Sequence, residues 1–400
     1  MGTGRTGDIS QNPEWREVSP LPAEKCPPFP KGEVIMEDSK YWIWLGSLVK
    51  IPPRSRYELL KHFGDPIGVW FSSETELERL PFLTRQMLKS LLDREYRKEA
   101  ATHLKSLTSS NIDIVTLYDE RYPEYLKNIP DPPVVVYVCG TLVKDEPCIA
   151  IVGSRRASPY GLSMAEKLAF ELSRAGLCVM SGMARGIDSR AHCGALSAGG
   201  RTIAVLGCGP DKVYPEENSE LAKRIRLKGA IISEFVPGTP PLPINFPFRN
   251  RIISGISQGV LVIEANERSG SLITAYYALE QGREVFAMPG NINSSTSRGT
   301  NRLIREGAKI VTDVGDILDE LKIIYGPGNT IHNAKRMFPT ESFTPDEKTI
   351  ARKLVDGPAH IDAIALDCGL SIQTAGSILI MLELSGFVEQ LPGKYYRLVE

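Results

Sequence analysis

Short apolar segments recur through the middle of the chain, each followed by a loop rich in glycine, serine and asparagine. The five segments are Ile149 to Val152, Leu177 to Met180, Ile203 to Leu206, Val260 to Ile263 and Val285 to Met288. Continuously apolar strands that alternate with helical patterns are typical of a parallel sheet covered by helices on both faces. The strands of such a sheet end at one edge, so we expect the loops to meet in one crevice. Doubly wound folds bind ligands there, and helix N-termini at this edge favour a ligand that carries phosphate.

The segments before the sheet predict a tail, a small helical domain and an edge extension. Residues 1–37 are rich in glycine, proline and polar residues and predict a disordered tail. Residues 38–108 show helical periodicity and predict a SAM-like or helix-hairpin-helix-like domain. Its candidate hairpins, Ile51–Arg54 and Leu80–Leu83, lack the glycine that lets backbone amides approach phosphate, so a scaffold or partner surface is expected. Short strands near 112–115 and 134–138 are expected to extend the main sheet, whose domain spans 109–323.

The last part of the chain predicts a linker over 324–343 and a winged-helix domain over 344–400. Three helical segments precede a hairpin there, and the third, Ser371–Leu384, would be the helix that enters a DNA groove. That helix contains Glu383 and no basic residue, and residues 341–400 hold five Lys or Arg against nine Asp or Glu, a net of −4. Phosphate neutralisation supplies most of the affinity for duplex DNA, so protein contact or packing is favoured over duplex binding.

Composition narrows the classes of function. The 400 residues carry a net charge of −1, which excludes a broad polybasic surface and limits nucleic-acid binding to a local patch. Seven scattered cysteines, without metal-ligand spacing, indicate the reduced cytosol. No apolar run reaches the length of a membrane span and no signal peptide is evident, so a cytoplasmic protein without a membrane partner is expected.

The crevice loops carry cationic side chains. Residues 146–322 hold 21 Lys or Arg and 18 Asp or Glu, a net of +3, and several of the arginines fall in the predicted loops. The segment Phe246–Arg251 places two aromatic rings and two arginines beside a helix predicted to start at Ile252. Bases stack on aromatic rings while guanidinium groups hold phosphates, so this combination favours single-stranded nucleic acid. A mononucleotide site would need far fewer cationic and aromatic side chains.

Several of these residues also have structural interpretations. Gly153 and Gly182 could serve turns alone, and Ser269 could be an N-cap, although both places also suit a phosphate. Asp188 and Ser189 could cap the helix that contains His192, and Asp188 and His192 are interpreted as structural residues. Glu264 lacks a partner carboxylate and is expected to pair with an arginine, Arg249 or Arg251, instead of acting in catalysis. For Phe246 and Phe248 the interpretation stays open between core and binding. For Tyr214, Pro215 and Asn218 it stays open between a turn or helix start and binding.

Across residues 111 to about 315, eight motifs in order resemble the DNA-processing protein A family, also called DprA or Smf. They include Gly153-Ser154-Arg155, Ser181-Gly182 with Gly186-Ile187-Asp188, Tyr214-Pro215 with Asn218, Phe246-Pro247 with Arg249-Asn250-Arg251, Glu264-Ala265, Ser269-Gly270-Ser271-Leu272-Ile273-Thr274-Ala275 and Met288-Pro289-Gly290. One such motif would be weak, but eight in sequence are hard to reach by accident.

The resemblance implies a cytosolic bacterial protein that binds single-stranded DNA without sequence preference, protects incoming strands during natural transformation and loads the RecA recombinase. It also implies a homodimer through the Rossmann-like domain and no catalysis. No cofactor and no metal site are expected from the sequence. Some members carry a basic residue shortly before the aromatic, whereas residues 242–245 are uncharged here, and Lys212 or Lys223 could compensate. The expected DNA contacts are Gly153, Ser154, Arg155, Arg156, Gly182, Arg185, Lys212, Lys223, Phe246, Arg249, Asn250, Arg251, Ser269, Gly270, Ser271 and Thr274.

Three other functions are alternatives to DNA binding. The nucleoside-monophosphate phosphoribohydrolases resemble the chain in topology, but their Pro-Gly-Gly-x-Gly-Thr motif and its catalytic glutamate are absent, and Ser269–Thr274 stands in their place. A dinucleotide oxidoreductase is disfavoured because the first strand opens on Gly153-Ser154-Arg155 and not on a G-x-G-x-x-G turn. An adaptor without a crevice ligand would bind partners but no DNA.

Overall fold

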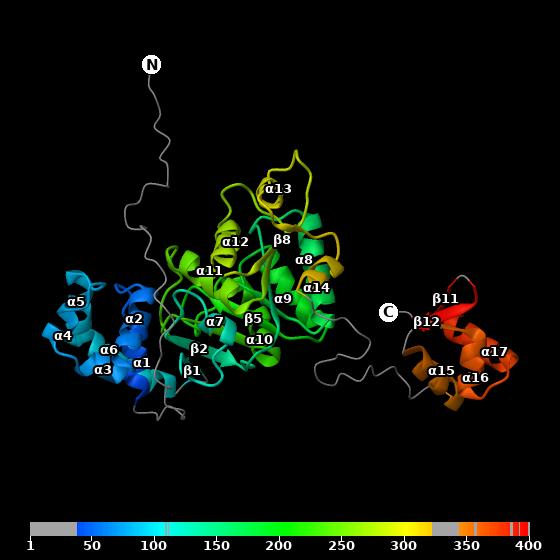
Figure 1. Cartoon of the computed structure of the whole chain (residues 1–400), viewed down its shortest axis with the longest axis horizontal. Coiled ribbons are helices and arrows are strands. Elements are labelled where there is room, and N and C mark those ends of the chain that lie inside the picture. The colour runs from blue at the N-terminus through cyan, green and yellow to red at the C-terminus, as the bar shows by residue number, and fades with distance from the viewer. Residues whose placement is uncertain are drawn as a thin grey trace, which may run out of the picture.

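The computed structural model describes residues 38–108, 110, 112–321, 344–355, 358–384, 387–391 and 393–398. Helices up to residue 108, a central α/β unit and a small C-terminal unit follow one another along the chain (Figure 1). The predicted tail over 1–37 and the predicted linker over 324–343 lie outside the described residues.

The central unit is built on a nine-stranded sheet with the order β1-β2-β6-β5-β4-β3-β7-β8-β9. From β6 to β9 all neighbouring strands are parallel, which confirms the predicted doubly wound, Rossmann-like α/β fold. The strands are β1 (Asp113–Thr116), β2 (Val135–Gly140), β3 (Cys148–Val152), β4 (Cys178–Ser181), β5 (Thr202–Leu206), β6 (Ala230–Ser233), β7 (Gly259–Val262), β8 (Glu284–Ala287) and β9 (Lys309–Ile310).

The five predicted strands are β3, β4, β5, β7 and β8. Two further parallel strands were not predicted: β6, whose four residues are all buried, and β9, whose two residues are both exposed. The chain runs outward from β3 through β4 and β5 to β6, then returns to β7 on the other side of β3. The β3–β7 boundary is therefore the topological switch point, where a doubly wound sheet opens a crevice at its carboxyl edge.

Helices cover both faces of this sheet, and alternate residues of one strand enter opposite cores. In β3, Ile149 and Ile151 pack under α8 and α9, while Ala150 and Val152 face the side of α11 and α12. This two-sided burial explains why the strand is apolar throughout. The helices of this unit are α7 (Glu124–Lys127), α8 (Pro159–Arg174), α9 (Ile187–Ser197), the short 3-10 helix η2 (Glu216–Asn218), α10 (Ser219–Lys228), α11 (Asn245–Ile256), α12 (Gly270–Glu280), α13 (Arg298–Arg305) and α14 (Gly315–Glu320).

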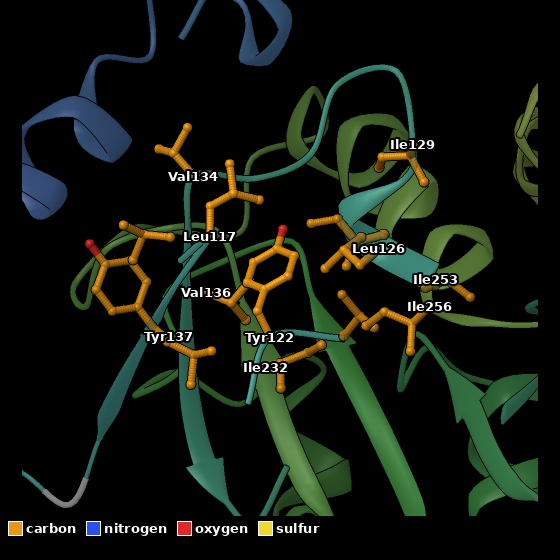
Figure 2. Close-up of a cluster of buried hydrophobic side chains, with 14 of the residues drawn as sticks. Leu117, Tyr122, Leu126, Ile129, Val134, Val136, Tyr137, Ile232, Ile253 and Ile256 are labelled. Carbon is orange, nitrogen blue, oxygen red and sulfur yellow. The ribbon is translucent and has the colours of Figure 1, made fainter. Parts of the chain in front are cut away.

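Strands β1 and β2 extend the sheet at one edge, as predicted. The two strands pair antiparallel with each other, and β2 pairs antiparallel with β6. A cluster of buried side chains fills the space between this edge and α11 (Figure 2). Within it the Tyr122 hydroxyl donates to the carbonyl oxygen of Pro133 at 2.7 Å, so the polar end of the ring is satisfied inside the cluster.

The N-terminal helices share one hydrophobic core with the edge of the sheet. Trp42, Trp44 and Leu45 on α1 are buried in the same cluster as Val135 and Tyr137 on β2. The helical domain is therefore packed against the central unit, as a scaffold would be. Its helices are α1 (Ser39–Ser47), α2 (Pro53–Phe63), α3 (Pro66–Phe71), α4 (Glu74–Glu78), α5 (Arg85–Leu92) and α6 (Arg94–Thr108).

The C-terminal unit has its own core and the predicted order of a winged helix. Its three-stranded sheet has the order β10-β12-β11. The elements are α15 (Pro345–Val355), β10 (Ala359–His360), α16 (Ile361–Cys368), α17 (Ile372–Leu384), β11 (Val388–Leu391) and β12 (Tyr395–Leu398). Across the described ranges no single helix has the length and apolar character of a membrane span. One pair bent by 110°, residues 361–368 and 372–383, meets the length and composition criteria only when taken together.

Candidate nucleic-acid interface

The loops after β3 and β7 are joined directly at the switch point. The amide of Ser154 donates to the carbonyl oxygen of Glu264 at 2.7 Å. Gly153 is required at this junction, because a Cβ there would lie 2.6 Å from the Ile187 side chain. The predicted convergence of the loops after the first and fourth predicted strands is thus present in the structure.

Phe246 forms the centre of an aromatic and cationic platform above the carboxyl end of β5. Its ring lies against Gly207, where an added Cβ would come within 2.9 Å of the ring. The Tyr214 ring is 5.7 Å from it between centroids, and the guanidinium carbons of Arg155 and Arg249 lie 5.3 and 5.8 Å from its centroid. We call these four side chains, Phe246, Tyr214, Arg155 and Arg249, the Phe246 platform.

The segment that carries Phe246 is helical and not a loop. Helix α11 begins at Asn245, seven residues before the predicted start at Ile252. Pro247 is compatible with this position because the first turn of a helix leaves its N–H groups without intrahelical partners. Phe246 is half-buried and Phe248 is 44% exposed, so both rings stand at the surface of the helix and neither belongs to the interior.

Arg249 supports the platform from below. Its side chain is buried, and Nη1 donates to the carbonyl oxygen of Gly182 at 2.9 Å and also to that of Val205. Burial lowers the pKa of Arg249 to about 10, so the group keeps its positive charge at neutral pH. The buried Asp188 carboxylate accepts from the Gly182 amide at 3.2 Å, and its charge also stabilises the Arg249 cation. The interpretation of Asp188 as structural agrees with this geometry, although it braces the loop after β4 and does not cap α9.

The exposed arginines of the crevice differ in whether they form an ion pair with a carboxylate. Within the described ranges, Arg155, Arg156 and Arg268 are exposed and have no ion-pair partner. Arg185 is also exposed but forms a two-point contact with Glu217, with nitrogen to oxygen distances of 2.6 and 2.8 Å. Surface pairs of this kind contribute little free energy, so a phosphate could displace Glu217.

Arg251 does not contact the crevice, contrary to the prediction from the sequence. Its side chain is fully buried, with Nη2 2.7 Å from Glu234 and Nε 3.1 Å from Asp131. Glu234 in turn lies 3.5 Å from Arg56 on α2, so the cluster joins α11 to the helical domain. The side chain points into the fold and cannot reach a ligand in the crevice. Arg251 is therefore a structural residue, and the expectation that it contacts DNA is revised.

The two predicted lysines occupy different places. Lys212 is exposed in the loop after β5, the same loop region that supplies Tyr214. Lys223 lies on α10, where Nζ is 2.6 Å from Glu220 on the same helix. In the part of the chain that the structure describes, no contact joins either lysine to the Phe246 platform; Lys212 shares the loop that carries Tyr214, whereas Lys223 is paired with Glu220 on α10.

The start of α12 offers an open helix N-terminus beside the platform. Ser269 caps the helix, accepting from the Ser271 amide at 3.4 Å, as the N-cap interpretation predicted. Gly270 is exposed, with open space where a Cβ would stand, and Asn250 donates to its carbonyl oxygen at 3.2 Å. Because Asn250 follows Arg249 on α11, this bond connects the α12 N-terminus to the platform. Thr274 is buried one turn later, so its side chain packs inside and does not face the crevice.

Glu264 occupies the N-terminus of α8. Its two carboxylate oxygens accept from the hydroxyl of Ser158 at 2.5 Å and from the amide of Ser158 at 2.9 Å. The expected pairing with Arg249 or Arg251 is wrong, because Glu264 sits against the N-cap of a neighbouring helix, where a negative charge is stabilised. This helix N-terminus is therefore not free for a phosphate. A cavity of about 340 Å³ adjoins Glu264 and is also lined by Tyr160 and Asn291.

His192 is a structural residue, as expected. Nδ1 lies 2.7 Å from the Thr202 hydroxyl, which itself donates to the Val179 carbonyl oxygen at 2.6 Å. His192 must then donate from Nδ1, which leaves a buried Nε2 without a partner. Burial lowers the pKa of this imidazole to about 3, so it is neutral near pH 7.

Two contributions were not among the expected contacts. Gly207 seats the Phe246 ring, and Tyr214 adds a second ring that is 40% exposed. The signal for Gly207 was its place immediately after an apolar strand. Asn218 does not face the crevice directly: its side chain donates to the Met183 carbonyl oxygen at 2.8 Å and fixes the loop after β4.

Comparisons with known proteins agree with this architecture. The family model of DNA recombination-mediator protein A matches residues 113–322, and that of the DprA winged helix domain matches residues 334–394. The DNA processing protein DprA of Bacillus subtilis is 42% identical over 236 residues, which cover 58% of this chain and 79% of that protein. Protein Smf of Escherichia coli is 35% identical over 379 residues, covering 91% and 96%. The X-ray structure of DNA processing protein A from Streptococcus pneumoniae matches with a TM-score of 0.58 and 35% identity, covering 70% of this chain and 97% of that one.

Proposed function

Because the chain belongs to the DNA recombination-mediator protein A family, we propose that it is a DNA-processing protein that binds single-stranded DNA in the crevice at the carboxyl edge of its sheet. The observation that carries the proposal is the Phe246 platform, in which two partly exposed rings stand beside two arginines. Unpaired bases stack on such rings, while the exposed Arg155 guanidinium and the α12 N-terminus hold successive phosphates, and the buried Arg249 supports the Phe246 ring from below. Stacking accepts any base, so sequence preference is weak.

Unpaired DNA fits this surface better than duplex. The rings of Phe246 and Tyr214 can stack only on bases whose faces are free, and a duplex hides those faces in its own stack. Helix α17 of the winged-helix unit, the helix expected to enter a DNA groove, adds no phosphate contact because it carries no basic residue. We assign direct DNA contact to Arg155, Arg156, Lys212, Phe246 and Asn250, together with the loops at Gly153, Ser154 and Ser269 to Ser271.

The remaining parts of the proposal come from the family resemblance. We propose that the protein acts in the cytoplasm as a homodimer through the Rossmann-like domain, protects incoming strands during transformation and loads RecA onto them. A test of the last step is the rate of RecA filament assembly on strands already covered by a single-strand-binding protein. The rate should rise when this protein is added and should stay low when Arg155→Ala is added instead.

We propose no catalytic role for the crevice. Both oxygens of Glu264 are engaged by Ser158, so this carboxylate is poorly placed to act as a general base or nucleophile. Incubation with each nucleoside monophosphate should release no free base. Release of base that is abolished by Glu264→Gln would support the phosphoribohydrolase alternative.

The decisive experiment is a titration of fluorescent oligo-dT with the whole protein. Phe246→Leu keeps an apolar side chain on Gly207 but loses the stacking face, and we expect a loss of about 1–3 kcal/mol of binding free energy. Arg155→Ala should weaken binding to all sequences alike and reduce the slope of log K against log salt by about 0.7. Arg174→Ala, an exposed arginine at the far end of α8, is the matched control and should bind as the parent does. Unchanged affinity for both platform variants would contradict the proposed site.

A further inference from the structure

Two cysteines and a glutamate meet at the amino edge of the sheet, opposite the crevice. Cys148 is the first residue of β3 and Cys178 the first of β4, and the two are partners in the parallel ladder. Both thiols are buried, and Glu146 lies just before β3. One ligand atom from each of these three residues lies within 4.8 Å of the other two, the only such group of metal-ligating side chains found in the described ranges.

The glutamate of this cluster is only half satisfied. Arg201 donates from Nε to Oε1 of Glu146 at 2.5 Å, and its other nitrogens are fixed by the carbonyl oxygens of Thr141 and Lys228. Oε2 of the same carboxylate is buried and has no hydrogen-bond partner. Burying a carboxylate oxygen without a hydrogen-bond partner destabilises the fold. The position of this oxygen beside two thiols therefore suits a ligand that would bind all three groups.

We propose that Glu146, Cys148 and Cys178 form a binding site for one thiophilic metal ion, represented by Zn²⁺. Thiolates select Zn²⁺ and similar soft or borderline ions, and a Cys₂Glu set supplies three of the four ligands of a tetrahedral centre. Two thiolates bound to one tetrahedral ion at about 2.3 Å have their sulfur atoms about 3.7 Å apart. The ligand atoms of this cluster already lie within 4.8 Å of one another, so small side-chain movements would bring them to bonding distance.

The fourth ligand and the charge balance are both available. A cavity of about 10 Å³, lined in part by Glu146 and Cys148, adjoins the cluster and has the size of one water molecule. Binding converts two thiols to thiolates and releases two protons. The ion, two thiolates and one carboxylate then sum to −1, which the Arg201 guanidinium neutralises.

The proton balance gives a quantitative signature. The Cys148 thiol donates to the carbonyl oxygen of Glu146 at 3.2 Å. Hydrogen bonding to Cys148, followed by burial, raises the pKa of Cys178. Because two protons leave per ion when both ligands bind as thiolates, the affinity for Zn²⁺ should rise up to about 100-fold per pH unit.

The test is a titration of the reduced full-length protein with Zn²⁺ against a chromogenic chelator, repeated with Co²⁺ in a spectrophotometer. We expect one equivalent of metal and, with Co²⁺, the thiolate charge-transfer and tetrahedral ligand-field bands. Cys178→Ser should abolish both, and Glu146→Gln should weaken binding at least tenfold. Cys193→Ser and Cys368→Ser are controls that remove thiols outside the cluster and should bind as the parent does.

Equal metal binding by the parent and Cys178→Ser, or Co²⁺ spectra without thiolate bands, would overturn the site. If Cys178→Ser does not fold, the parent alone still decides, because bound Zn²⁺ should raise its melting temperature and slow alkylation of Cys148 in peptide mapping. No shift and no protection would overturn the proposal. Oligo-dT affinity should be the same with and without Zn²⁺. A negative result in the metal experiment would therefore not contradict the proposed DNA site in the crevice.

Discussion

The guanidinium of Arg249 lies directly against Gly182, with Nη1 2.9 Å from the Gly182 carbonyl oxygen. A Cβ on residue 182 would stand 2.5 to 2.6 Å from three atoms of that guanidinium. The loop after β4 and helix α11 can approach this closely only because residue 182 has no side chain. The same arginine supports the Phe246 ring. The lack of a side chain at residue 182, in the loop after β4, therefore helps to set the position of the Phe246 ring on α11.

Gly182→Ala should therefore weaken single-stranded DNA binding without adding or removing a charge. The methyl group must displace the buried guanidinium, and overpacking of this kind costs about 1–3 kcal/mol of folding free energy. We expect oligo-dT affinity to fall about tenfold in anisotropy titrations. Gly46→Ala in helix α1 is the control, because its methyl group would meet the side chains of Val135 and Val134 at ordinary contact distances of 3.5 to 3.9 Å. Parent-like affinity for Gly182→Ala would show that the platform does not depend on Arg249.

Arg251→Met should destabilise the fold. Removing the arginine leaves Glu234 and Asp131 with less compensation in a buried cluster, and breaking buried ion pairs in this way costs about 3–5 kcal/mol. Urea unfolding should show the loss, whereas Arg174→Met at the surface should change stability by less than about 0.5 kcal/mol. Under native conditions the folded fraction of Arg251→Met should still bind oligo-dT. Loss of binding with unchanged stability would restore Arg251 as a DNA contact.

Stability should fall as the pH is lowered, in part because of His192. Its pKa is about 3 in the folded protein and near 6.5 when exposed, so the unfolded chain takes up a proton between these values and the folded chain does not. The contribution of His192 is complete above about pH 6.5 and is reduced by about 2 kcal/mol at pH 5. His192→Gln should show a smaller loss between pH 7 and pH 5 in urea unfolding, while His62→Gln, an exposed residue, should follow the parent. Equal pH dependence for all three would contradict the assignment.

Duplex DNA should compete poorly for the protein. The crevice offers stacking surfaces that duplex cannot use, and the C-terminal 60 residues carry a net charge of −4. An unlabelled duplex should need at least about tenfold higher concentration than oligo-dT of equal length to displace the labelled strand at 150 mM salt. Equal competition would point to a backbone-only site or to a duplex-binding winged helix.

Part of the fold and of the site was predictable because it follows from local patterns. Ile149–Val152 reads as a strand because both of its faces are buried, and the loop after it reads as part of a ligand crevice because all parallel strands end at one edge. The predicted helix start at Ile252 is seven residues too late, because α11 begins at Asn245 and its first turn tolerates Pro247.

The amino-acid sequence by itself determined the doubly wound sheet, the winged helix, the family and the cationic loops, because periodicity and local motifs are properties of neighbouring residues. Only the tertiary structure decided which arginines face the crevice. Arg249 and Arg251 are two positions apart on α11, yet one lies under Phe246 and the other joins Glu234 in the interior, since successive helical positions point about 100° apart. The same holds for Cys148 and Cys178, which are 30 residues apart in the chain and become neighbours only when β3 pairs with β4.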